Sequence, residues 1–181
     1  MVPPIPFFDW IPKMTTFLEI LETETAKPGS YSTTTDATGT GSVRVADDYA
    51  ASVSTYGSVS VGGSQTGNIE INGDNDWFAT SRLSAGTTYS VSLRGASSGG
   101  GTLVDPVIDS IRDFSGISIA NTYSDDGGTG YDSLVSFTPA TSGYYYVVAR
   151  SVGNTGTGTY TLSIASSAPS TYFPQLIVQK E

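Results

Sequence analysis

The chain contains no cysteine and no histidine among its 181 residues. Without cysteine there is no disulfide framework and no thiolate metal site. Without histidine, a Ser–His–Asp triad, a Cys–His pair and the usual zinc hydrolase centre are all excluded. We therefore expect a protein that has no catalytic residues and is not an enzyme.

Charged residues are scarce, and basic ones especially so. They make up 14% of the chain, with 8 Lys and Arg against 17 Asp and Glu and a net charge of −9. Such a surface repels phosphate backbones, so nucleic acid is not an expected partner. The acids comprise 12 Asp and only 5 Glu. Short carboxylates concentrated in loops favour a hard cation such as Ca²⁺.

Long apolar runs are also missing. No stretch of 18 apolar residues occurs, so no membrane-spanning helix is expected. The first residues, MVPPIPFFDWIPK, are apolar but interrupted by proline, and they lack the basic region of a Sec signal peptide. We therefore expect either another export route or a chain that begins after processing.

Residues 1–41 are expected to lie outside the main domain. Residues 1–12 form a Pro-rich aromatic arm with an extended, polyproline-like path, or else a disordered leader. The spacing of Met14, Phe17, Leu18 and Leu21 predicts a short helix over residues 14–25, with a strand as the rival. Residues 29–41 have the composition of a linker.

Residues 42–166 have the pattern of an all-β domain. Short alternating runs recur between Gly, Asn and Asp clusters. The alternation is cleanest in Tyr89–Leu93 and in Tyr160–Ile164. We expect strands at 58–61, 67–71, 77–83, 87–94, 106–112, 117–123, 133–138, 144–151 and 159–165. This number predicts a jelly-roll-like antiparallel β-sandwich of eight to nine strands.

The residues Tyr144, Tyr145 and Tyr146 allow two interpretations. Stacking on a carbohydrate is one. Because side chains alternate along a strand, Tyr145 must face opposite to its neighbours, so core packing on one face is the favoured account.

Aspartates gather in three loops that are rich in glycine or asparagine. The candidate metal ligands are Asp47, Asp48, Asp74, Asp76, Asp105, Asp125, Asp126 and Asp132. Calcium takes six to eight oxygen ligands from carboxylates, carbonyls and water. None of the loops matches the EF-hand pattern. Ordinary turn capping by Asp and a glycosidase pair of acids are the alternatives.

Blocks of sequence between Asp47 and Leu162 resemble the bacterial pre-peptidase C-terminal domain family, as found in serralysin-like and RTX-type secreted proteins. The matching blocks are Asp47-Asp48-Tyr49-Ala50, Gly67-Asn68-Ile69-Glu70, Gly73-Asp74-Asn75-Asp76-Trp77-Phe78, Leu83-Ser84-Ala85-Gly86-Thr87-Thr88-Tyr89, Gly101-Thr102-Leu103-Val104-Asp105-Pro106, Asp125-Asp126-Gly127-Gly128, Ser142-Gly143-Tyr144-Tyr145-Tyr146-Val147 and Gly156-Thr157-Gly158-Thr159-Tyr160-Thr161-Leu162. The resemblance implies a jelly-roll sandwich, export from a bacterial cell and calcium binding by all the candidate aspartates except Asp132. At Asp132 the family pattern suggests Asn or a similar residue.

These observations predict a secreted or cell-surface calcium-binding module with a structural or adhesive role. The apolar segments at residues 1–28 and 171–181, the latter within a tail at 167–181, could join copies into a homo-oligomer or filament. The alternative is an accessory domain that binds a polysaccharide or a peptide.

Overall fold

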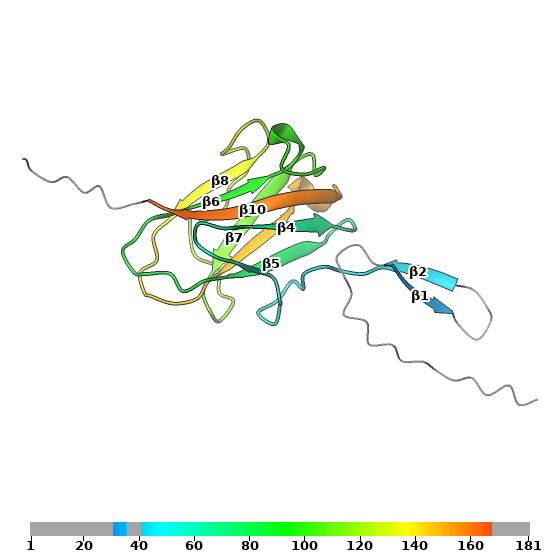
Figure 1. Ribbon diagram of the computed structural model, residues 1–181, viewed down its shortest axis with the longest axis horizontal. Coiled ribbons are helices and arrows are strands. Elements are labelled where there is room, and N and C mark those ends of the chain that lie inside the picture. The colour runs from blue at the N-terminus through cyan, green and yellow to red at the C-terminus, as the bar shows by residue number, and fades with distance from the viewer. Residues whose placement is uncertain (1–30, 36–40, 168–181) are drawn as a thin grey trace, which may run out of the picture.

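The computed structural model describes residues 31–35 and 41–167, whose regular elements are β-strands and two short 3₁₀ turns. The strands are β1 (Tyr31–Thr35), β2 (Gly41–Val45), β3 (Ser58–Val59), β4 (Ser64–Ile69), β5 (Asn75–Thr80), β6 (Tyr89–Arg94), β7 (Pro106–Arg112), β8 (Ser133–Phe137), β9 (Tyr146–Ser151) and β10 (Gly158–Ser166). The predicted β-sandwich is confirmed, because eight strands form two facing four-stranded sheets (Figure 1).

One sheet has the order β4-β10-β6-β8 and the other has the order β3-β5-β9-β7. Every pairing within them is antiparallel except that between β3 and β5, which is parallel. Strands β4 and β5 are consecutive but belong to different sheets. The turn between them therefore crosses the rim of the sandwich, where its acidic residues meet the segment before β3.

The core lies between the sheets and follows the alternation of the sequence. Tyr89, Val91 and Leu93 of β6 are buried, as are the alternate residues Tyr160–Ile164 of β10, which confirms both predicted faces. Phe78 of β5 is fully buried among them. Burial of a side chain of this size contributes about 1.5–3 kcal/mol. Because neighbouring positions stay polar, each strand has one orientation that satisfies both faces.

The expected strand at residues 117–123 is wrong in detail. The segment makes only isolated bridges to β7, at Arg112–Ser118 and Ile108–Ser124. Between them the Thr122 hydroxyl accepts a hydrogen bond from the Ile111 amide and donates one to the Ile119 carbonyl. A side chain thus replaces the backbone ladder, which the β-favouring composition did not reveal.

Part of the expected linker is also ordered differently from the prediction. Residues 31–35 and 41–45 pair as the antiparallel strands β1 and β2. The Pro-rich arm, the expected helix at residues 14–25 and the segment 168–181 of the expected tail lie outside the described residues. Within the described part of the chain, no helix has the length and apolar character needed to cross a membrane.

The side chains of the three consecutive tyrosines alternate between two faces, as expected for extended backbone. Tyr145 is buried, its ring centroid is 5.1 Å from that of Phe137, and its hydroxyl donates to the Thr141 carbonyl. Tyr144 is exposed and Tyr146 lies half-buried on the outer face of the β5–β9 pair. Core packing therefore accounts for Tyr145, while its two neighbours face outward.

Candidate metal centre

Five carboxylates converge at the rim where β4 turns into β5. We name this group the rim cluster; it comprises Asp47, Asp48, Glu70, Asp74 and Asp76. Oxygen atoms of Asp47, Glu70 and Asp74 lie within 4.8 Å of one another, and so do oxygen atoms of Asp47, Asp48 and Asp76. Asp47 is common to both triplets, so one continuous patch of oxygen atoms joins the five residues.

The β4–β5 turn places three of these acids on one side. Gly73 has φ +90°, a backbone conformation that favours glycine, and it allows the chain to reverse tightly. The Asp74 amide donates to the Ile71 carbonyl, and the Glu70 amide donates to Asp74 Oδ2. These bonds fix Glu70 just after β4 and Asp76 just inside β5.

Tyr49 brings the other two acids to the same rim. Its ring is buried 4.5 Å from the Phe78 ring, and its hydroxyl donates to the Thr66 carbonyl. Its amide donates to Asp47 Oδ1. The aromatic anchor therefore fixes the position of Asp47 and Asp48 even though they precede the turn by more than twenty residues.

Several oxygen atoms of the rim cluster are buried without a hydrogen-bond donor. Asp76 has 0% exposure and Asp48 has 3%. One oxygen of each, together with both carboxylate oxygens of Glu70, has no partner among the described residues. The second oxygen of Asp76 accepts a short hydrogen bond from the buried Tyr160 hydroxyl. Buried polar atoms are nearly always paired in folded proteins, so these four carboxylate oxygens must be compensated either by protons or by a cation.

Burial and mutual repulsion disfavour ionisation in this cluster. Burial raises the pKa of Asp48 to about 7, and the charges of Asp74 and Asp47 add to the rise. Burial raises the pKa of Glu70 to about 8, and the neighbouring Asp74 and Asp48 carboxylates add to the rise. Burial also raises the pKa of Asp76 to about 9, although the Tyr160 hydroxyl opposes the rise. Without a compensating cation, the cluster must therefore hold protons near neutral pH.

This set of donors fits calcium. Five carboxylates supply enough oxygens for the six to eight that Ca²⁺ takes, in mono- or bidentate contacts. Mg²⁺ is smaller, requires near-octahedral geometry and retains several waters, so a crowded set of acids suits it less well. No nitrogen or sulfur ligand is present, which also disfavours zinc.

A second acidic group, the β7-side trio, joins Asp105, Asp125 and Asp126, with oxygen atoms within 4.8 Å of one another. One oxygen each of Asp105 and Asp125 is buried without a partner. Burial raises the pKa of Asp105, and the charges of the other two acids add to the rise. The trio is more open than the rim cluster, because Asp126 is exposed. The Tyr123 hydroxyl donates to Asp125.

Asp132 belongs to neither group. Its side chain is buried, and its Oδ1 accepts the Gly95 amide at 2.9 Å. Its carbonyl oxygen accepts the Gly128 amide at 2.7 Å. These contacts join two loops, while Asp132 Oδ2 is buried without a hydrogen-bond partner among the described residues.

Glu70 is the one acid of the rim cluster that is not among the predicted metal ligands. It stands in the matching block Gly67–Glu70, three residues before Gly73. The tight turn at Gly73 brings Glu70 beside Asp74, and the Glu70 amide donates to Asp74 Oδ2. Aspartate-rich composition alone does not indicate this contact.

Comparison with known proteins finds several solved structures that are similar to the sandwich. The sandwich is similar to the pre-peptidase C-terminal domain of a collagenase from Bacillus anthracis. The identity is 17%, the match covers 60% of this chain and 92% of that chain, and the TM-score is 0.46. The name of that domain is that of the family which the sequence blocks resemble. No family model and no curated protein matches the chain.

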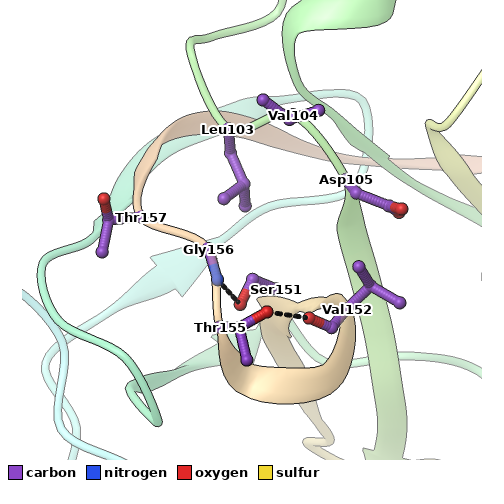
Figure 2. A pocket seen from close by; sticks show the side chains of 8 residues that line it. All are labelled: Leu103, Val104, Asp105, Ser151, Val152, Thr155, Gly156 and Thr157. Carbon is purple, nitrogen blue, oxygen red and sulfur yellow. Dashed lines mark hydrogen bonds between the residues drawn. The ribbon is translucent and has the colours of Figure 1, made fainter.

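A small cavity lies beside the β7-side trio, between the loop before β7 and the loop after β9 (Figure 2). Its volume is about 270 Å³, and it is lined by Leu103, Val104, Asp105, Ser151, Val152, Thr155, Gly156 and Thr157. The Ser151 hydroxyl accepts the Gly156 amide, which holds the loop after β9 in place. Small-molecule sites usually have volumes of about 300–1,000 Å³. The cavity is therefore suited to a single aliphatic side chain more than to a cofactor.

Proposed function

We propose that this chain is a calcium-stabilised, non-catalytic structural module of a secreted or cell-surface bacterial protein. The observation that supports it is the rim cluster, in which four buried carboxylate oxygens have no hydrogen-bond partner among the described residues. The acidic composition and the resemblance in sequence to a family of exported accessory domains are consistent with this role.

The carboxylates of the rim cluster require compensation by a cation or by protons. Bringing several ionised carboxylates within 4.8 Å in a partly dehydrated site costs several kcal/mol unless their charge is compensated. Protons can also neutralise the carboxylates, but each protonated acid then becomes a hydrogen-bond donor that needs an acceptor of its own. A bound Ca²⁺ would neutralise two charges and give the orphaned oxygens a common partner.

Calcium at this position would act as a clamp on the fold. Asp47 and Asp48 belong to the segment that enters the sandwich, while Glu70 and Asp74 belong to the β4–β5 turn and Asp76 to the start of β5. A shared ion would tie the two together and stabilise the folded state by about 2.7 kcal/mol when calcium is present at 100 times its Kd. A module that carries load or resists proteolysis outside the cell gains directly from such a clamp.

The same acids are poorly arranged for glycoside hydrolysis. That reaction requires two carboxyl groups that reach opposite sides of a sugar bond. Asp76 and Asp48 are almost completely buried, and Asp76 is bonded to the Tyr160 hydroxyl inside the core. A substrate could not approach them without opening the sandwich, which favours a structural role.

An accessory role in binding a peptide is the second candidate, and the cavity beside Asp105 favours it. An aliphatic side chain would fill the space around Leu103 and Val152, and a neighbouring basic residue would meet the β7-side trio. Replacement of Val152, which lines the cavity, with Trp would close it. Loss of peptide capture in that variant, with calcium binding unchanged, would support this second role.

The test of the first proposal is thermal unfolding with calcium and with an excess of EGTA. We expect calcium to raise the melting temperature of the native chain and isothermal titration to give at least one bound ion. Glu70→Gln keeps the size of the side chain but removes a charge, and it should weaken calcium binding at least tenfold. Asp113→Asn is a matched control, because Asp113 lies outside both acidic groups and its Oδ1 accepts two amides that asparagine can also bind. Equal melting temperatures with calcium and with EGTA would contradict the proposal.

A further inference from the structure

The outer face of the β5–β9 pair carries an apolar surface that the rim cluster does not explain. We name it the outer patch; it comprises Val53, Trp77, Phe114, Ile117 and Tyr146. Val53 is 48% exposed, Phe114 75% and Ile117 66%. Contiguous apolar surface of this kind on a soluble domain usually marks a place of interaction.

The two rings at the centre of the outer patch form an inclined pair. The ring centroids of Trp77 and Tyr146 are 5.9 Å apart, at an interplanar angle of 51°. The Tyr146 hydroxyl donates to the Val53 carbonyl, and the Arg112 guanidinium lies 4.7 Å above the Trp77 ring. Both rings are half-buried, so each keeps an exposed edge in a fixed position.

The exposed members are also held rigidly. Asp113 Oδ1 accepts the amides of Ser115 and Ile117, and the Asp113 amide donates to the Ile117 carbonyl. A Cβ built on Gly116 would lie 3.2 Å from Val53 and 3.6 Å from Trp77, so this turn packs directly against the rings. The protein therefore presents Phe114 and Ile117 to solvent on a turn that is closed by side-chain hydrogen bonds.

We propose that the outer patch is the docking site for the chain's own Pro-rich arm, residues 3–12. The arm has the sequence PPIPFFDWIP, with four prolines and three aromatic residues. Extended proline segments bind to grooves formed by Trp and Tyr rings, because the polyproline conformation loses little entropy on binding and the proline rings pack on aromatic faces. The exposed edges of Trp77 and Tyr146, together with the exposed Phe114 and Ile117, offer an apolar surface for such a segment.

Two further features favour this occupant over a foreign one. Asp9 gives the arm a carboxylate, and Arg112 gives the patch a partly exposed cation that donates to the Gly116 carbonyl and lies 3.9 Å from Asp109. The arm is joined to Val53 through residues 13–52, of which 31–45 fold back as the β1–β2 pair; the other residues span on the order of 80 Å when extended. A tether of this kind gives an effective concentration of up to about a millimolar, so even weak docking in the same chain is favoured over binding of a second copy.

The test uses the two tryptophans of the chain, one in the arm and one in the patch. The full chain is labelled with 5-fluorotryptophan, and Trp10→Phe assigns the two fluorine resonances. We expect the Trp10 resonance to be displaced from its position in a synthetic peptide of residues 1–13. Phe114→Ser with Ile117→Ser should return it to the peptide position, since both replaced side chains are more than half exposed and their loss spares the core.

Tyr131→Ser is the matched control, because Tyr131 is 55% exposed and belongs to the loop between Asp125 and Asp132, outside the patch. It should leave the Trp10 resonance where it is. A Trp10 resonance identical in peptide and full chain would overturn the inference, as would a displaced one that the double variant leaves unchanged. Loss of the displacement on tenfold dilution, together with a dimeric or larger mass at the higher concentration, would place the arm on a neighbouring copy and equally overturn docking within one chain.

Discussion

The stabilisation by calcium should depend on pH in a direction that the rim cluster dictates. In the calcium-free folded protein, burial raises the pKa values of Asp48, Glu70 and Asp76 to about 7, 8 and 9. In the unfolded chain these groups return to ordinary values near 4. Between those limits the folded state holds more protons than the unfolded state, so the free energy of unfolding must fall as the pH rises from about 4 towards 7–9.

The magnitude follows from the number of protons retained. One carboxyl that stays protonated only in the folded state costs about 1.4 kcal/mol of stability for each pH unit. From pH 5 to pH 7, a single retained proton therefore removes about 3 kcal/mol. For a domain of this size that loss lowers the melting temperature by roughly 10 °C. Calcium displaces the protons, so its own stabilising effect should be small at pH 5 and large at pH 8.

Differential scanning calorimetry at pH 5, 6, 7 and 8, with calcium and with EGTA, measures both effects. Asp76→Asn should flatten the slope of the calcium-free series, because it removes the acid with the most strongly raised pKa in the cluster. Asp113→Asn should retain the slope. The reasoning is refuted if the calcium-free melting temperature stays constant or rises between pH 5 and pH 8, or if EGTA lowers the melting temperature equally at both ends of that range.

Two substitutions test how the site is supported by the fold. A Cβ at Gly67 would lie 2.3 Å from the Tyr160 hydroxyl oxygen, so Gly67→Ala should cost about 1–3 kcal/mol in urea unfolding and weaken calcium binding by displacing the partner of Asp76. Asp132→Ala leaves the Gly95 amide without its acceptor and should cost about 1–3 kcal/mol. It should leave the calcium stoichiometry unchanged by titration calorimetry, and a lost ion would show that Asp132 is a ligand after all.

The strands were predictable because their signal is local. Alternation over Tyr89–Leu93 and Tyr160–Ile164 predicted buried faces that the sandwich confirms. The segment 117–123 has similar composition, yet Asn121 takes a positive φ of 61° and the Thr122 hydroxyl replaces a ladder bond. Such a substitution of side chain for backbone depends on where β7 lies, and no local pattern encodes it.

The acidic groups were predictable only in part, for the same reason. Composition indicated that Asp47, Asp48, Asp74 and Asp76 belong to a calcium site, and the structure brings these four together. It could not indicate that Glu70 completes the group, since that depends on the tight turn at Gly73. Composition also could not separate Asp132 from the β7-side trio. The amide that donates a hydrogen bond to Asp132 belongs to Gly95, 37 positions earlier in the sequence.

The rim cluster is coupled to the core through two tyrosines, and this coupling sets what loss of calcium would do. Tyr160 donates to Asp76 from the core, and its ring lies 6.2 Å from that of Phe78 in an edge-on contact. The Tyr49 amide donates to Asp47, and the Tyr49 ring packs with its centroid 4.5 Å from that of Phe78. Repulsion among unneutralised carboxylates would therefore act on both neighbours of one buried ring. For this reason we expect calcium removal to destabilise the whole sandwich cooperatively, instead of loosening only the rim.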